Sequence, residues 1–128
     1  MPLEVHKMKK VLIVEDQADI RELIRMTLEI EDFDIHEAEN GDIGLQMARQ
    51  LKPDLVLLDV MMPGTLDGFG VCSHIKGDPS LKKIKVVILS AKGQDNDKQQ
   101  GKSAGADGYL TKPFSPRQLL DVVSRQMG

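Results

Sequence analysis

Three short apolar runs of the sequence each end in an acidic or hydroxyl side chain, and a fourth is followed two residues later by a lysine. The polar residues at these points are Glu15 with Asp16, Asp59, Ser90 and Lys112. Three carboxylates gathered in one crevice repel each other, so at least one must be protonated or a cation must lie among them. These residue types therefore indicate a cation site if the four runs lie side by side.

The ligands available in this set are all oxygen atoms, with no histidine or cysteine beside them. That donor chemistry favours Mg²⁺ or Mn²⁺ over zinc, and Mg²⁺ readily takes a phosphate oxygen. A carboxylate such as Asp59 can act as a nucleophile and form an aspartyl-phosphate. The metal, the Lys112 ammonium and the Ser90 hydroxyl would then stabilise the outer oxygens of the phosphoryl group.

Each of these residues also has a simpler interpretation. A single aspartate at the end of a strand usually caps a helix or belongs to a turn, and Asp16 could cap the helix that follows it. Lys112 alone would be a solvated side chain, and Ser90 alone could cap a helix. The simpler interpretation requires four independent coincidences at strand ends, so we favour the joint one.

The elements that would position these residues alternate along the chain. Apolar runs predict strands at 10–15, 33–38, 55–58, 86–89 and 109–110. Apolar residues at helical spacing follow the first three of these strands, a fourth helix would follow the fourth strand, and Ser115-Pro116 is a favourable start for a fifth helix. Such alternation predicts an α/β fold with a doubly wound parallel sheet, and we choose the flavodoxin-like order 2-1-3-4-5 with five helices.

In such a sheet, ligands bind beyond the carboxyl ends of the strands, which is where the polar residues above lie. The fourth helix is the least certain element, because residues 93–102 carry almost no apolar stripe. We expect this helix to bury little and to be the most mobile regular element.

Composition predicts one domain, residues 1–128, since 41% of the 128 residues are hydrophobic and 29% are charged. A net charge of -3 gives no general attraction to nucleic acid or to an anionic membrane. The single cysteine, Cys72, excludes an internal disulfide and is expected to be a small core residue. We see neither a signal peptide nor a membrane span, and we predict a cytoplasmic location.

Five motifs together carry a resemblance to a known family. They are VED at 14–16, LLDVMMPG at 57–64, LSA at 89–91, GADGYL at 105–110 and TKPF at 111–114. In this combination the chain closely resembles the receiver domain of two-component response regulators, in particular the stand-alone, chemotaxis-type regulators, from Val11 to Val123. The loop from Pro63 to Gly68 looks one residue longer than is usual in that family.

The resemblance implies a role for each acidic residue. Asp59 would be the residue phosphorylated, with Mg²⁺ as cofactor. Glu15 and Asp16 would hold the metal, together with Asp59 itself and the backbone carbonyl of Met61. Met61 also stands at one of two variable positions that tune phosphoryl lifetime in this family, and Lys92 stands at the other.

The resemblance also implies a switch. Lys112 would contact the phosphoryl group and Ser90 would donate its hydroxyl to it, while Tyr109 matches an aromatic residue that swings inward when the serine moves. The Lys112-Pro113 bond matches one that is cis in the family. The face made by the fourth helix, fifth strand and fifth helix would then change shape for a partner to read.

The implied partners are a histidine kinase or phosphotransfer protein, and downstream either a target protein or an output domain outside this chain. A phosphorylation-dependent homodimer stays open, and direct contact with nucleic acid or membrane is not expected. His6, His36 and His74 are expected to be surface or partly buried residues rather than phosphorylation sites.

Two other functional classes compete with this one. A phosphatase or mutase using aspartyl chemistry would need an acid two residues after the nucleophile, where Met61 stands. A flavin- or nucleotide-binding module would need glycines and open amides after the first strand. Glu15-Asp16-Gln17 offers repulsion to a phosphate there instead.

Overall fold

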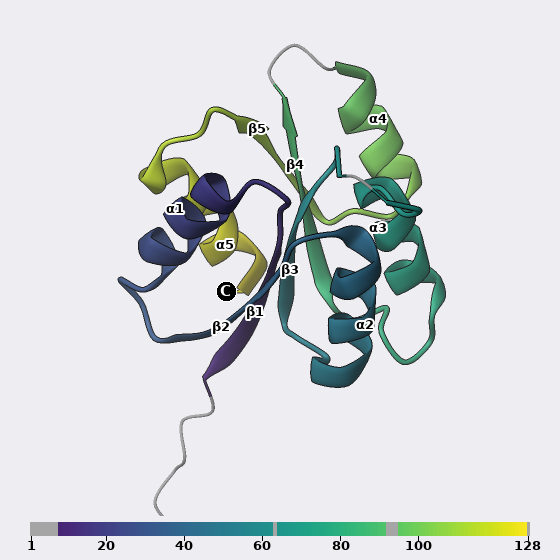
Figure 1. Ribbon diagram of the computed structural model, residues 1–128, viewed down its shortest axis with the longest axis horizontal. Coiled ribbons are helices and arrows are strands. Elements are labelled where there is room, and N and C mark those ends of the chain that lie inside the picture. Colours follow the sequence, from purple (N-terminus) through teal and green to yellow (C-terminus); the bar gives the residue numbers. More distant parts are fainter. Residues whose placement is uncertain (1–7, 63, 92–94, 128) are drawn as a thin grey trace, which may run out of the picture.

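A five-stranded parallel sheet lies at the centre of the molecule, as a computed structural model shows for residues 8–62, 64–91 and 95–127 (Figure 1). The strand order is β2-β1-β3-β4-β5, which confirms the predicted topology. The strands are β1 (Lys9–Val14), β2 (Phe33–Ala38), β3 (Leu55–Asp59), β4 (Lys85–Ala91) and β5 (Gly108–Lys112). The helices are α1 (Ala18–Leu28), α2 (Gly41–Leu51), α3 (Gly68–Gly77), α4 (Asp95–Ser103) and α5 (Pro116–Met127).

Two hydrophobic cores cover the two faces of the sheet, which explains why its central strands are apolar throughout. Successive side chains of a strand point to opposite faces. Val11 and Ile13 of β1 therefore join the core under α1 and α5, whereas Leu12 and Val14 join the core under α2 and α3. Figure 1 shows α1 and α5 on one side of the sheet and α2, α3 and α4 on the other.

The helix starts explain several connections, and one of them corrects a prediction. Asn40 caps α2 by accepting a hydrogen bond from the Ile43 amide at 2.8 Å. Ser115 and Gln118 form a reciprocal capping box at the start of α5, as expected for Ser115-Pro116. The suggestion that Asp16 caps the first helix is wrong, because the N-cap of α1 is Gln17 and no side chain completes that cap. Asp16 is thereby free to face the edge of the sheet.

Two strands are longer than their apolar runs. β4 continues through Ser90 to Ala91 and β5 continues to Lys112, because these residues pair with each other in register (Ser90 with Thr111, Ala91 with Lys112). Polar side chains gave no sign of this pairing in the sequence. The extension carries Lys112 on the last residue of a strand instead of in a loop, so its backbone is fixed by the sheet.

The helix α4 forms where the sequence was least decisive. Where the burial of its residues is described, at 96 and 98–103, all are exposed apart from Gly101, which is consistent with the weak apolar stripe. Its mobility stays a prediction. The apolar face of α1 is narrow, because Ile24 and Leu28 are buried whereas Leu23 is half exposed. Within the described ranges, no helix has the length and apolar character needed to cross a bilayer.

Candidate functional site

Three carboxylates meet at the carboxyl edge of the sheet, as the alternation of strands predicted. Glu15 follows β1, Asp16 comes next, and Asp59 ends the neighbouring strand β3. One carboxylate oxygen from each lies within 4.8 Å of the other two. Glu15 and Asp59 are buried, whereas Asp16 is exposed at the rim. The cluster can therefore be reached from solvent through Asp16.

Lys112 brings an ammonium group into the cluster, and it is the one that contacts these carboxylates among the described residues. Its Nζ donates to Oε2 of Glu15 at 2.9 Å and to Oδ1 of Asp59 at 3.1 Å. Lys112 ends β5, which is separated from β3 by β4, so its long side chain crosses the end of the intervening strand. The Lys112-Pro113 peptide is cis, as the resemblance implied.

Burial governs the acidity of the two inner carboxyl groups. It raises the pKa of Glu15 to about 7, although the hydrogen bond from Lys112 acts in the opposite direction. Burial also raises the pKa of Asp59, again against the pull of Lys112. Desolvation alone would lower the pKa of Lys112, but its contacts with Glu15 and Asp59 raise it instead. One ammonium thus does not balance three carboxyl groups, and the site favours a further positive charge.

Ser90 and Tyr109 lie beside each other on β4 and β5. Ser90 is buried, and its hydroxyl donates to the hydroxyl oxygen of Tyr109. The half-buried Tyr109 ring packs against the core on the α3 side of the sheet. The two residues expected to move together are therefore already in contact. The inward swing itself stays a prediction.

The loop after Asp59 passes close over the backbone of that residue. The Gly68 amide donates to the carbonyl of Val60 at 3.0 Å, and a Cβ on Gly68 would overlap the carbonyl oxygen of Asp59. Glycine is therefore required at this position. The loop is tied to α2 by a 2.7 Å hydrogen bond from the Thr65 hydroxyl to the Asp42 carboxylate, a contact that its predicted extra length did not reveal.

A hollow of about 770 Å³ opens beside the acidic cluster, between α3 and α4. Its lining includes Asp16, Met61, Phe69, Ser73 and Gln100. The Met61 side chain is 78% exposed, so it leaves the approach to the carboxylates open. That the Met61 carbonyl binds a metal stays a prediction.

Other residues singled out in the sequence lie away from this site. Cys72 is buried under the sheet and burial raises its pKa to about 11, which confirms an inert core thiol. His36 is half-buried on β2 and His74 is exposed on α3, as expected. His6, Pro63 and Lys92 lie outside the described residues.

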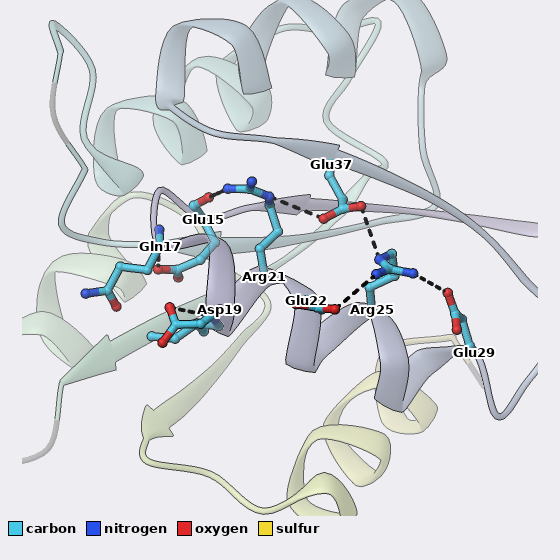
Figure 2. A network of polar contacts seen from close by, with 9 residues as sticks. Glu15, Gln17, Asp19, Arg21, Glu22, Arg25, Glu29 and Glu37 are labelled. Atoms are coloured by element: carbon cyan, nitrogen blue, oxygen red, sulfur yellow. Dashed lines mark hydrogen bonds and ion pairs between the residues drawn. The ribbon is translucent and has the colours of Figure 1, made fainter.

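Two residues near the site were given no role from the sequence. Arg21 of α1 donates from its guanidinium to the backbone carbonyl of Glu15 at 2.7 Å, and its Nε lies 3.2 Å from the Glu37 carboxylate (Figure 2). The sequence signal was weak, because an arginine on a helix is usually solvated and Glu37 follows an edge-strand pattern. Arg21 and Glu37 meet because β2, which carries Glu37, pairs with β1, which ends next to Glu15.

The residues present fit a divalent cation of the Mg²⁺ class. The donors are carboxylate oxygens, and two of them belong to buried side chains whose pKa values are raised by burial. Hard cations prefer such oxygen ligands. No nitrogen or sulfur ligand lies in the cluster among the described residues, so zinc is not favoured.

Comparison with known proteins agrees with this geometry. The family model described as "Response regulator receiver domain" matches residues 11–124. The transcriptional regulatory protein ResD of Bacillus subtilis (strain 168) is 47% identical over 111 residues, covering 87% of this chain and 45% of that protein. The phosphate regulon transcriptional regulatory protein PhoB of Pseudomonas aeruginosa is 44% identical over 123 residues, covering 94% and 53%. The chain thus spans about half the length of these curated relatives.

Solved structures give the same result. The chemotaxis response regulator CheY4 of Vibrio cholerae superposes with a TM-score of 0.87 at 32% identity, covering 94% of this chain and 99% of that one. The REC domain of AraT, a response regulator from Geobacillus stearothermophilus, gives 0.83 at 28% identity, covering 94% and 93%. The fold and the site define a phosphoacceptor signalling module with an acidic, oxygen-lined pocket. The chain belongs to the receiver domain family of two-component response regulators.

Members of this family are phosphorylation-activated signalling modules that bind Mg²⁺ in an acidic pocket and interact with histidine kinases and output domains. This chain has the family's fold and an acidic cluster at the corresponding edge of the sheet.

Proposed function

We propose that Asp59 of this chain accepts a phosphoryl group from a phosphohistidine of a histidine kinase or phosphotransfer protein. One observation carries the proposal. The Lys112 ammonium bridges Asp59 to Glu15 inside a cluster of three carboxylates, which leaves a surplus of negative charge suited to a dication, and the dication with Lys112 would then accept the phosphoryl oxygens. An ordinary structural ion pair would have no surplus of negative charge.

In the transfer step, a carboxylate oxygen of Asp59 attacks phosphorus, the O–P bond forms, and the N–P bond of the donor breaks. The imidazole leaves with the electron pair of that bond. The Lys112 ammonium donates a hydrogen bond to Asp59 and would offset the negative charge that gathers on the phosphoryl oxygens. Glu15, Asp16, Asp59 and the Met61 carbonyl would hold Mg²⁺. When bound, the ion would supply positive charge that stabilises the phosphoryl oxygens.

Phosphorylation would then act on the Ser90–Tyr109 pair. A phosphoryl group offers acceptor oxygens to the Ser90 hydroxyl, which at present donates to Tyr109. Tyr109 can then occupy the space that Ser90 leaves, and the α4–β5–α5 face changes shape. A target protein or an output domain would read this face, and a phosphorylation-dependent homodimer is a further way in which it can be covered.

We further propose that residues 1–128 form one receiver unit that works in the cytoplasm. The domain assists its own phosphorylation and dephosphorylation, because the same groups orient the acyl phosphate for attack by water, and it has no separate metabolic substrate. The stand-alone, chemotaxis-type role and that of a receiver attached to an output domain both use this chemistry.

Incubation with acetyl phosphate and Mg²⁺ followed by intact-mass measurement tests the assignment. The wild-type chain is expected to gain one phosphoryl group that is lost on brief acid or base treatment, and EDTA should prevent the gain. Asp59→Asn should gain nothing. Asp54→Asn is the matched control, since Asp54 precedes the same strand at its opposite end. An acid-stable adduct, or one that survives Asp59→Asn, would contradict the proposal.

A further inference from the structure

Arg21 contacts the acidic cluster through the backbone rather than through a carboxylate. Its guanidinium donates to the Glu15 carbonyl at 2.7 Å from one nitrogen, and its Nε faces Glu37 at 3.2 Å. Figure 2 shows the guanidinium lying between these two partners. The Arg21 side chain is 20% exposed, so the hydrogen bond is shielded from water. The helix α1 thus reaches back to the residue that begins the site.

The peptide unit held by Arg21 sets the direction of two metal-site side chains. The carbonyl of Glu15 and the amide of Asp16 belong to the same planar group, whose tilt is shared between ψ of Glu15 and φ of Asp16. The rest of Glu15 is held as well: its amide donates to the Ala38 carbonyl at 3.1 Å, and its carboxylate accepts from the Gln17 amide at 3.4 Å. Arg21 therefore fixes the backbone carbonyl of Glu15 as well.

Glu37 keeps the arginine directed at the carbonyl. One carboxylate oxygen of Glu37 faces Arg21, and the other lies 3.4 Å from Nε of Arg25. Arg25 is in turn paired with Glu29 at 2.7 Å. A guanidinium without the Glu37 contact would be free to turn toward the carboxylates of the cluster, where it would compete with a cation. The ion pair between Glu37 and Arg21 prevents this arrangement.

We propose that Arg21 is a positioning residue of the cation site: it orients the Glu15–Asp16 peptide so that both carboxylates face the bound ion, and Glu37 holds it in place. The inference rests on the proposed function in one respect, namely that Glu15 and Asp16 bind the cation. Residues that orient metal ligands from outside the ligand set typically change metal affinity by about 10-fold to 100-fold when removed.

Divalent-cation titration of the purified chain tests this inference, with Mn²⁺ followed by electron paramagnetic resonance and Mg²⁺ by calorimetry. The chain has no tryptophan to report binding. Arg21→Ala is expected to weaken binding of both ions about 10-fold. Arg21→Lys, which keeps the charge but cannot contact both partners in the same geometry, should lie between Arg21→Ala and wild type. Glu37→Gln should weaken binding by a smaller factor than Arg21→Ala.

Arg25→Ala is the matched control. Arg25 shares Glu37 and the same helix, but among the described residues its guanidinium pairs with glutamates other than Glu15, so this variant should bind both ions as wild type does. Thermal unfolding without metal measures stability separately. If Arg21→Ala does not fold, the Arg21→Lys and Glu37→Gln titrations decide the question.

The outcomes separate the two proposals. A wild-type chain that binds no divalent cation contradicts the proposed function. A wild-type chain that binds, while the Arg21 and Glu37 variants bind equally well or Arg25→Ala weakens binding as much as Arg21→Ala, contradicts only the positioning role.

Discussion

The two ends of the sheet both hold charged side chains, but they are arranged in opposite ways. At the amino end, the Lys76 ammonium lies 2.6 Å from the Asp107 carboxylate, which also accepts from the Val86 amide at 2.8 Å. Lys76 further donates to the Ile84 carbonyl at 2.7 Å. One cation meets one anion there, and the remaining hydrogen-bonding capacity of the pair is taken up by backbone groups of the same chain.

At the carboxyl end, one ammonium faces three carboxyl groups, and burial raises the pKa of both inner ones. The amino-end pair joins α3, β4 and the turn before β5, so its partners are satisfied within the fold. The carboxyl-end cluster would be completed by something that the chain does not supply. A balanced pair of charges thus marks a structural contact, whereas an unbalanced cluster marks a binding site.

The largest expected effect is a fall in stability of the metal-free protein as pH rises, caused by Glu15. The pKa of Glu15 is about 7 in the folded state and 4.5 is its ordinary value, so the folded state binds its proton more tightly. This contribution is complete below pH 4.5 and is lost as pH rises through 7, by ~3 kcal/mol at most.

Urea denaturation from pH 4.5 to 8 measures this effect, with Glu15→Gln as the comparison. The difference in free energy of unfolding between variant and wild type should move in favour of the variant as pH rises. Addition of Mg²⁺ should reduce the difference at pH 8, because the ion favours the carboxylate. A difference that does not change with pH would show that Glu15 is ionised throughout.

A smaller effect is expected from breaking the balanced pair at the amino end. Lys76→Met leaves the Asp107 carboxylate without its ammonium, and both side chains are partly exposed at 17% and 23%. We expect a loss of about 2 kcal/mol in free energy of unfolding, below the cost for a fully buried pair. Affinity for Mg²⁺ should be unchanged.

Urea denaturation and cation titration check this prediction together. Lys82→Met is a suitable control, because only the backbone carbonyl of Lys82 takes part in the contact with Lys76. A change in Mg²⁺ affinity in Lys76→Met would mean that the two ends of the sheet are coupled. The amino-end pair would then not be a structural contact alone.

The smallest effect is expected from relieving the imbalance at the carboxyl end. Asp59→Asn keeps the shape of the side chain and an oxygen for Lys112, but it removes a negative charge that burial disfavours. In metal-free buffer at pH 8, we expect urea denaturation to show that the variant is more stable than wild type. A loss of stability would show that the Asp59 charge mainly stabilises the fold through Lys112.

Much of the fold was predictable because apolar runs and turn residues act locally. The continuous runs of β1 and β3 indicate strands covered on both faces, and Ser115-Pro116 indicates the start of α5, where the structure has a capping box. The extensions of β4 and β5 were not predictable, because Ser90 and Lys112 are polar and enter the sheet only by pairing with one another's strands.

The candidate site divides in the same way. The sequence by itself determined which side chains meet, because parallel strands bring their carboxyl ends to one edge and Glu15, Asp59, Ser90 and Lys112 stand at those ends. The contacts that hold these side chains could be seen only in the folded molecule. They are the hydrogen bonds from Lys112 to Glu15 and Asp59, the Ser90–Tyr109 contact and the hydrogen bond from Arg21 to the Glu15 carbonyl. The reason is physical. Residue type and spacing choose an element and its end, but the direction of a side chain depends on neighbours that lie far away along the chain.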